Sequence, residues 1–278
     1  MQETIAIVFD FDDTLAPDTT SGFLDWIGIG DVEAFWADEV APLVRDGWDP
    51  VPAYMYAMVE AGRTGRCRPI TRQALAEWGA LAPLHTGVPG LFERLRTAVH
   101  AENPRVALEF YVISSGIGDV LRATSIAGDF TAIWSSEFHF GADGAACFPR
   151  RVVSFTDKTR YLFHVQKGLI GPEADANPFA VNRRVAPDKL RVPLSHMIFV
   201  GDGYTDIPCF SLLEQQGGTP IAVYDPQRRD KWRRAFDFVR EGRVRTLHSA
   251  NYDPGSDLSN SLDMAVSAIA GDLRQHAG

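Results

Sequence analysis

The sequence predicts an α/β protein built on a parallel sheet that is covered by helices. Short runs of β-branched and apolar residues recur along the chain, as expected of strands that are buried on both faces. Amphipathic segments with helical periodicity lie between these runs, and this alternation is typical of parallel α/β sheets. Ligands of such sheets bind beyond the carboxyl ends of the strands, so the residues that follow each run are candidates for a site.

Four apolar runs are the predicted strands, and polar or glycine-containing turns follow the first three. The first run leads into Asp10-Phe11-Asp12-Asp13-Thr14, the second into Ser114-Ser115-Gly116 and the third into Gly201-Asp202-Gly203. The first run should be central in the sheet, because it is apolar throughout. The four runs cover residues 5–9, 108–113, 196–200 and 220–224.

Helical periodicity predicts six helices around these strands. Each has apolar residues at intervals of three or four, with polar residues between them. Together with the strands they give the repeated strand–helix units of a Rossmann-like sheet. The six helices cover residues 89–100, 117–126, 158–167, 205–214, 227–239 and 257–273.

Residues 18–85 interrupt this alternation and are predicted to form an inserted helical unit. They contain no β-branched run, and their tryptophan and tyrosine residues recur at helical spacing, which usually marks the core of a small helical unit. Pro52 suits the first turn of a helix, where a missing N–H costs nothing. We therefore expect a core of residues 1–17 and 86–278 with a helical insertion at 18–85. Its helices should cover residues 21–29, 32–45, 52–61 and 71–81.

Two further segments do not follow the strand–helix pattern. Residues 137–154 contain Asp143-Gly144, a strong hairpin turn signal flanked by aromatic and β-forming residues, and predict a small antiparallel β-hairpin appendage. Residues 171–193 contain four prolines and few large apolar residues, and predict a long surface connection.

Composition excludes several classes of protein. The chain has 278 residues, with 27 Lys and Arg against 36 Asp and Glu, and its formal charge of −9 disfavours nucleic acid as a ligand. No apolar run approaches the length that spans a bilayer, which argues against a membrane protein. Three cysteines without a CxxC pair argue against a disulfide framework or a zinc cluster. The N-terminus lacks the basic region of a signal peptide, so a cytoplasmic location is expected, while nothing indicates the oligomeric state.

The acidic segment after the first predicted strand is the first candidate for chemistry. Asp10, Asp12 and Asp13 follow a buried strand directly, and mutual repulsion among their carboxylates calls for a cation. An acidic turn can also simply cap a strand, so this motif alone does not decide between structure and function.

Three later segments shift the balance towards function. Ser114-Ser115-Gly116 places hydroxyl groups and a glycine turn after another strand, a natural place to hold a phosphoryl oxygen. Lys158 is the first lysine in the chain and begins a predicted helix. Asp202 and Asp206, in Gly201-Asp202-Gly203-Tyr204-Thr205-Asp206, lie four residues apart on a strand-to-helix turn, so that the second carboxylate can point back toward the first.

In this order, these four segments resemble the four motifs of the haloacid dehalogenase (HAD) superfamily. The resemblance extends from residue 5 to about residue 224, and the helical stretch of residues 18–85 is similar to the C1 cap of that family. The phosphoserine-phosphatase-like branch fits best, because it also combines a helical cap with a small hairpin before the lysine. The resemblance thus implies the HAD fold and a hydrolase that acts on phosphoric monoesters.

The resemblance also implies roles for individual residues. Asp10 would be the nucleophile that takes the phosphoryl group, and Asp12 would be the general acid and then the base for the attacking water. Ser114 would hold a phosphoryl oxygen, with Ser115 and Gly116 in the same phosphate-binding turn. Lys158 would offset the negative charge of carboxylate and phosphate.

A magnesium site and a loop-orienting residue follow from the same resemblance. Mg²⁺ would be bound by Asp10, the backbone carbonyl of Asp12 and Asp202, with Asp206 binding directly or through a water. Thr14 would orient the loop next to the phosphate. The superfamily tolerates variety at the position of Asp13, so this residue receives no role.

Residue identities narrow the reaction within the superfamily. Dehalogenases of the superfamily lack an acid two residues after the nucleophile, whereas Asp12 is present here, so dehalogenation is disfavoured. Phosphonate-cleaving members use a cap lysine, but no lysine precedes Lys158 in this chain. The leading interpretation is a Mg²⁺-dependent phosphatase that hydrolyses a small phosphorylated metabolite through an aspartyl-phosphate.

The sequence leaves two alternative functions open and does not identify the substrate. The same residues could serve a phosphotransferase or phosphomutase, and the fold could instead be a catalytically silent regulatory binding module. The arginine cluster of the helical insertion could bind a second anionic group of the substrate, but such clusters are more often an exposed charged face. It consists of Arg63, Arg66, Arg68 and Arg72.

Overall fold

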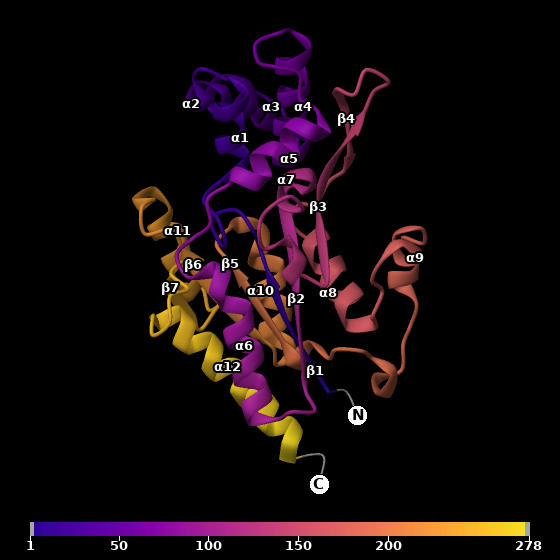
Figure 1. Cartoon of the computed structure of the whole chain (residues 1–278), viewed down its shortest axis with the longest axis vertical. Helices are drawn as coiled ribbons and strands as arrows, with labels where there is room; N and C mark the ends of the chain where they lie inside the picture. Colours follow the sequence, from indigo (N-terminus) through magenta and orange to yellow (C-terminus); the bar gives the residue numbers. More distant parts are fainter. Residues whose placement is uncertain (1–2, 276–278) are drawn as a thin grey trace.

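The computed structural model describes residues 3–275, apart from the side chains of residues 229–231 and 234, and confirms the predicted α/β class. A seven-stranded sheet forms the centre, with the strand order β4-β3-β2-β1-β5-β6-β7 (Figure 1). All neighbouring strands are parallel except β3 and β4. The sheet is therefore Rossmann-like, and its parallel strands all direct their carboxyl ends to one edge.

The four predicted strands are confirmed, and the first of them is central. In β1, residues Ile5 to Phe9 are completely buried, because helices cover both faces of the sheet. Its neighbours are parallel and in register, with Ile7 opposite Phe110 of β2 on one side and Ile198 of β5 on the other. These four strands are β1 (Thr4–Phe9), β2 (Ala107–Ile117), β5 (Met197–Gly201) and β6 (Thr219–Tyr224).

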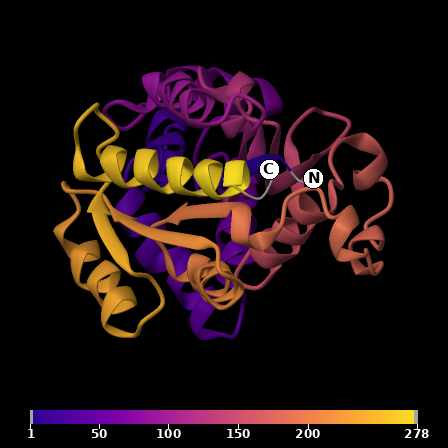
Figure 2. The ribbon, with the colours of Figure 1, turned by 90° about the horizontal axis from the view of Figure 1, so that it is seen from below.

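The helices form one layer on each face of the sheet (Figure 2). On one face, α6 (Val88–Glu102) and α12 (Asp257–Gln275) pack over Ile5, Ile7 and Phe9. On the other face, the core around Ala6 and Val8 is closed by helices that supply Leu162, Phe210 and Phe238. The helices of this second layer are α8 (Asp157–Lys167), α10 (Ile207–Gln216) and α11 (Arg229–Arg240).

The helix expected at residues 117–126 is largely wrong. Strand β2 continues to Ile117 because it goes on pairing with β3, where Ile117 lies opposite Ser136. Only α7 (Gly118–Leu121) follows it, and turns lead on to a short 3-10 helix (Ala127–Asp129). The prediction also missed β7 (Thr246–Ser249) and the first part of β3 (Ala132–Phe140), whose last residues belong to the hairpin predicted at residues 137–154.

The predicted hairpin exists, but it is part of the main sheet rather than a separate appendage. Strand β3 pairs in parallel with β2 at its start and antiparallel with β4 (Ala146–Arg151) toward its end. Gly144 adopts the left-handed conformation in the connecting turn, with a φ of +78°, which glycine accepts without strain.

The stretch at residues 171–193, predicted as a long connection, contains only short helices. They are α9 (Pro172–Asp175) and two 3-10 turns (Ala180–Asn182 and Pro187–Lys189).

The segment at residues 18–85 is helical, as expected, and lies beyond the carboxyl ends of the parallel strands (Figure 1). Asp18, Asp49 and Thr71 accept hydrogen bonds from backbone N–H groups at three helix starts and so define where these helices begin. The helices are α1 (Thr19–Ile27), α2 (Val32–Ala34), a π-helical turn (Phe35–Val40), α3 (Ala41–Arg45), α4 (Pro50–Arg63) and α5 (Arg72–Leu81).

The chain enters and leaves this helical segment at one place. The backbone N–H of His85 donates to the carbonyl of Leu15 at 2.9 Å, so the two connections lie side by side. A second contact is made by α5, where Gly79 approaches α7 so closely that a Cβ there would lie 2.3 Å from the carbonyl oxygen of Val120. Within residues 3–275, no helix has the length and apolar character needed to cross a bilayer.

Candidate active site

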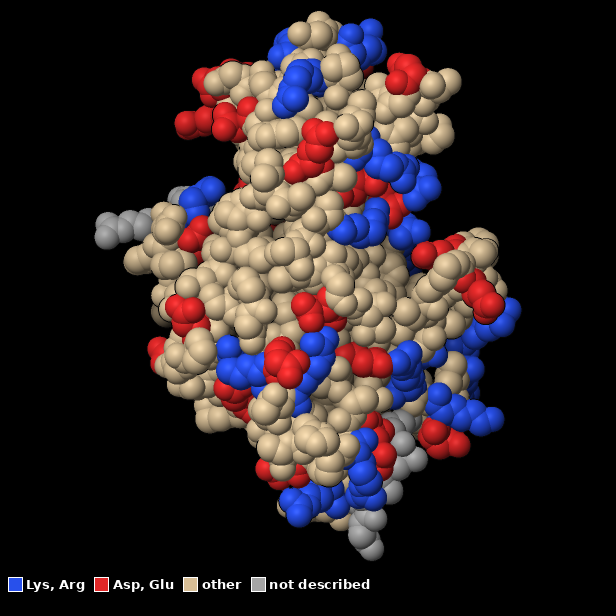
Figure 3. All heavy atoms as spheres, in the orientation of Figure 1, with Lys and Arg blue, Asp and Glu red and all other residues tan. Residues whose placement is uncertain are grey.

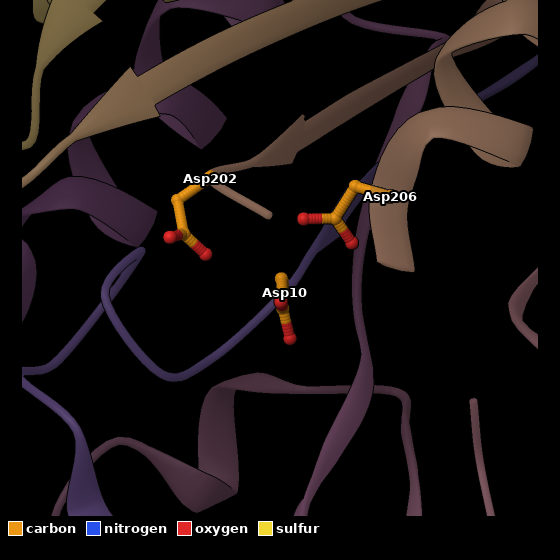
Figure 4. A group of neighbouring side chains, drawn as sticks. All are labelled: Asp10, Asp202 and Asp206. Carbon is orange, nitrogen blue, oxygen red and sulfur yellow. The ribbon is translucent and has the colours of Figure 1, made fainter. Parts of the chain in front are cut away.

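Three aspartates from two neighbouring strand ends meet at the carboxyl edge of the sheet. Asp10 follows β1, Asp202 follows β5, and Asp206 closes the 3-10 turn that leads into α10. One oxygen of each carboxylate lies within 4.8 Å of the other two, and all three side chains are buried (Figure 4). The sequence separates Asp10 from Asp206 by most of the chain, and the parallel pairing of β1 with β5 brings them together.

Lys158, in the first turn of α8, reaches the same place. Its Nζ lies 2.9 Å from Oδ2 of Asp10 and 2.7 Å from Oδ1 of Asp206, and the lysine is completely buried. Burial alone would lower the pKa of Lys158, but the two adjacent carboxylates outweigh it and raise the pKa above its ordinary value. The ammonium group is therefore a fixed positive charge between two carboxylates.

Asp10 is held on both of its oxygens. Its Oδ1 accepts a hydrogen bond from the backbone N–H of Phe11 at 2.7 Å, and its Oδ2 faces Lys158. Burial raises the pKa of Asp10 to about 6, although the positive charge of Lys158 opposes this shift. Near neutral pH the side chain is thus mainly ionised, as a nucleophilic carboxylate must be.

The side chain of Asp12 points to the helical segment instead of joining the three-aspartate group. Its Oδ1 accepts hydrogen bonds from the backbone N–H of Thr19 at 2.8 Å and from the Thr19 hydroxyl at 2.6 Å. Burial, together with the negative charge of Asp18, raises the pKa of Asp12 to about 8. Two carboxyl groups two residues apart thus have different protonation states at neutral pH, which is a recurring arrangement at acid–base sites.

The turn predicted at Ser114-Ser115-Gly116 is wrong, because these residues still belong to β2, where its pairing with β3 becomes irregular. This end of β2 packs directly against Asp12. A Cβ on Gly116 would lie 2.4 Å from Oδ2 of Asp12, so only glycine fits there. The N–H of Gly116 donates to Oγ of Ser114 at 3.0 Å, which fixes this hydroxyl oxygen at the end of the strand. The hydroxyl of Ser115 is buried, and no hydrogen-bond partner lies among the described residues.

Thr14 lies at the end of the acidic segment. Its backbone carbonyl accepts a hydrogen bond from the Tyr252 hydroxyl at 3.0 Å, which ties this segment to the chain before α12. The hydroxyl of Thr14 is buried without a hydrogen-bond partner among residues 3–275. Asp13, which received no role, is buried with a φ of +57° and forms the tight turn of the segment.

The glycines around Asp202 shape the third turn. A Cβ on Gly201 would lie 2.4 Å from Oδ2 of Asp206, so the close approach of this carboxylate to the strand end requires glycine. The N–H of Gly203 donates to the same oxygen at 2.9 Å. The glycine spacing that identified the motif in the sequence therefore has a direct steric cause.

Sequence reasoning missed three residues of the helical segment that contact the site. Thr19 binds Asp12, Asp18 lies next to Asp12, and Tyr54 of α4 donates its hydroxyl to the carbonyl of Ser115 at 2.6 Å. Asp18 carried a usable signal, because an aspartate before an amphipathic stretch is a typical helix N-cap. Tyr54 had no such signal in the sequence, because helical periodicity does not show which aromatic residue will contact a distant part of the chain.

The arginines of the helical segment contact other groups of the protein. Arg63 pairs with Glu60 at 2.6 Å, and Arg66 pairs with Glu39 through both of its terminal nitrogens. Arg68 lies over the Trp26 ring at 4.5 Å, and Arg72 lies over the Phe140 ring at 4.8 Å. These contacts favour an exposed charged face over a substrate-binding cluster.

Comparisons with known proteins agree with this fold. No family model matches the sequence. An uncharacterized protein of Borreliella burgdorferi is 25% identical, over 93% of this chain and 95% of that protein. A probable phosphoserine phosphatase from Vibrio cholerae has a TM-score of 0.58 at 12% identity, with 98% of this chain and 67% of that one covered.

Two further solved structures are similar. A HAD family hydrolase from Salmonella enterica serovar Typhi gives a TM-score of 0.53 at 14% identity, over 82% of this chain. The chain spans only 65% of the length of that hydrolase. A phosphoserine phosphatase solved as an analogue of its phospho-aspartyl intermediate gives a TM-score of 0.51 at 15% identity, over 94% of this chain and 99% of that one. The chain thus has the fold of HAD hydrolases of the phosphoserine-phosphatase-like type, as the sequence motifs implied.

Proposed function

We propose that this protein is a Mg²⁺-dependent phosphatase that hydrolyses a small phosphorylated metabolite. The observation that carries the proposal is the buried group in which Lys158 lies between Asp10 and Asp206, with Asp202 close by. Asp12 lies two residues from Asp10, and burial raises its pKa. This arrangement provides an ionised nucleophile, a protonated acid and a fixed positive charge within one site. The HAD fold, which phosphatases share, supports the same activity.

In the proposed first step, a carboxylate oxygen of Asp10 attacks phosphorus and the bond to the leaving oxygen breaks. The carboxyl proton of Asp12 passes to this leaving oxygen, so the alcohol departs neutral and an aspartyl-phosphate remains. Lys158 offsets the charge of the phosphoryl group where it meets Asp10. Ser114, with Ser115 and Gly116, would hold a phosphoryl oxygen, and Thr14 would orient the loop.

In the second step, the ionised Asp12 takes a proton from water, and the resulting hydroxide attacks the phosphorus of the aspartyl-phosphate. The bond between phosphorus and the Asp10 oxygen breaks, which restores the Asp10 carboxylate, the protonated Asp12 and free phosphate. Thr19 supports both steps, because its two hydrogen bonds hold one oxygen of Asp12 in place and leave the other to exchange the proton.

The donor set fits the metal that the fold implies. Three buried carboxylates with one oxygen each within 4.8 Å offer only oxygen ligands, which hard divalent cations such as Mg²⁺ prefer. Asp10, the Asp12 backbone carbonyl, Asp202 and Asp206 would hold it. When bound, the ion supplies a Lewis acid that draws negative charge from the phosphoryl oxygens.

We also propose that different parts of the chain catalyse the reaction and cover the site. Residues 1–17 and 86–278 would form the catalytic core, and residues 18–85 would form a cap that covers the site and excludes water. The adjacent entry and exit connections at Leu15 and His85 support this division, because the chain enters and leaves the helical segment at the same place.

A hydrolysis screen tests the proposal. The purified protein should release phosphate from some members of a panel of phosphorylated metabolites with Mg²⁺, and EDTA should abolish the release. Substrate consumption without release of free phosphate, accelerated by an added alcohol acceptor, would point to a phosphotransferase. Failure to act on any phosphomonoester with Mg²⁺ would contradict the proposed activity.

A further inference from the structure

A cavity of about 340 Å³ lies behind the active site, on the far side of helix α8. It is open to solvent on one side and is lined by residues at the end of β4, on one face of α8 and in the segment that contains α9. Its volume falls in the range of small-ligand pockets. Three arginines line it: Arg150, Arg151 and Arg160.

The guanidinium groups of this arginine pocket are only partly neutralised. Arg151 lies 3.3 Å from Asp175, and Arg160 lies 3.3 Å from Asp157. Glu137 is shared, because Arg122, Arg150 and Arg151 all approach it. Among the residues that line the pocket, three arginines face two carboxylates, those of Asp157 and Asp175.

Arg160 has a buried guanidinium nitrogen that its contacts with Asp157 and Tyr161 leave without a hydrogen bond. Its Nε is buried, and no hydrogen-bond partner lies among the described residues, while its Nη2 contacts the hydroxyl of Tyr161 and the carboxylate of Asp157. A buried guanidinium N–H without a partner costs free energy, which an anionic oxygen would recover. This contrasts with Arg66 of the helical segment, whose two terminal nitrogens both pair with Glu39.

The pocket is concave, and the surface around it is basic. Figure 3 shows Lys and Arg atoms gathered on this face below the β3–β4 hairpin, next to the protruding segment that contains α9. Arg150 and Arg160 keep 60% and 38% of their side chains exposed, so both can turn toward a bound ligand. His164, whose pKa is lowered by burial, adds a neutral imidazole to the wall.

Helix α8 connects this pocket to the active site. Asp157, Arg160, Tyr161 and His164 follow the spacing of one helix face and line the pocket. Lys158 lies on the other side of the helix, where it binds Asp10 and Asp206. A ligand in the pocket would therefore contact the same helical turn that positions the catalytic ammonium.

From these contacts we propose that the arginine pocket binds a small polyanion that carries phosphate groups, at a site separate from the active site. Arginine forks bind phosphate oxygens through paired hydrogen bonds, and three guanidinium groups around one pocket suit a ligand with more than one negative charge. This site does not depend on the proposed phosphatase activity, since it uses none of the motif residues.

Thermal unfolding with inorganic pyrophosphate in EDTA tests the proposal. We expect a saturable upward shift in the melting temperature of the wild-type protein. The double variant Arg151→Gln/Arg160→Gln should weaken this binding about 10-fold or more, since two charge-assisted contacts are lost. The matched control is Arg245→Gln, which removes an arginine from the exposed ion pair with Glu214 and should change nothing.

An active-site variant identifies where the probe binds. Lys158→Met should retain the shift, because its ammonium does not face the pocket; if this variant does not fold by circular dichroism, Ser114→Ala takes its place. The proposal is overturned if the wild-type protein shows no saturable shift. It is also overturned if the active-site variant weakens binding more than the double arginine variant does.

Discussion

The two sides of the active site differ in how their charges are arranged. On the sheet side, Lys158 lies between Asp10 and Asp206, so opposite charges neutralise each other at contacts below 3 Å. On the side of the helical segment, Asp12 faces Thr19 and the like-charged Asp18, and its pKa rises to about 8. The difference indicates that contacts on the sheet side keep Asp10 and Lys158 charged, whereas the surroundings of Asp12 favour its protonated form.

Asp10→Asn is expected to have the largest effect on the sheet side. The amide is nearly isosteric but cannot act as the nucleophile, so turnover of p-nitrophenyl phosphate should fall by about 10⁴-fold or more. Lys158 keeps Asp206 as a partner, and thermal unfolding should therefore stay close to wild type. Activity near the wild-type level would rule out the covalent mechanism.

Asp12→Asn tests the protonated side of the site. The variant should lose about 10²- to 10⁴-fold in turnover of an alkyl phosphate, because its leaving oxygen needs a proton. The loss should be smaller for an aryl phosphate, whose leaving group departs more easily without one. Rates for both esters, measured with the same preparation, give the comparison. Equal losses would mean that Asp12 only positions the loop.

Asp202→Ala should weaken the metal site on the sheet side. With one oxygen ligand gone, the Mg²⁺ concentration for half-maximal activity should rise by about 10-fold or more. A Mg²⁺ titration of activity measures this, with Asp25→Asn as a control at an exposed aspartate outside the site. Wild-type activity that is indifferent to EDTA would contradict the metal assignment.

Asp18→Asn sharpens the comparison at the helical segment. Asparagine caps helices as well as aspartate does, so α1 should persist while one negative charge is lost. Asp18 raises the pKa of Asp12, and its neutralisation should lower that pKa. Activity that requires protonated Asp12 should then decline at lower pH than in the wild type. A pH–rate profile of kcat checks this, and an unchanged alkaline limb would show that Asp18 does not influence Asp12.

The smallest effect is expected for the arginines of the helical segment. Arg63→Gln and Arg66→Gln each remove one partner of an exposed ion pair, and solvent screens such pairs so strongly that stability should hardly change. The ranking of substrates in a hydrolysis screen should stay the same. A changed ranking would show that these side chains bind substrate after all.

Local sequence patterns predicted most of the sheet but missed the edge strand β7 and the first part of β3. The four apolar runs became β1, β2, β5 and β6, because a buried parallel strand needs apolar residues on both faces. Strand β7 is short and half-buried, so it has no such pattern. Strand β3 contains polar residues such as Ser135 and Ser136, and its pairing with β2 replaced the helix expected at residues 117–126.

The sequence by itself determined the sheet side of the site. Asp10, Ser114 and Asp202 follow apolar runs, and parallel pairing must bring the ends of those runs to one edge. Only the tertiary structure decided the other side. The contact of Tyr54 with the Ser115 carbonyl, 61 residues away, depends on how α4 docks over the sheet. Helical periodicity identifies a buried face but not the surface that covers it, so these contacts become visible only when the chain has folded.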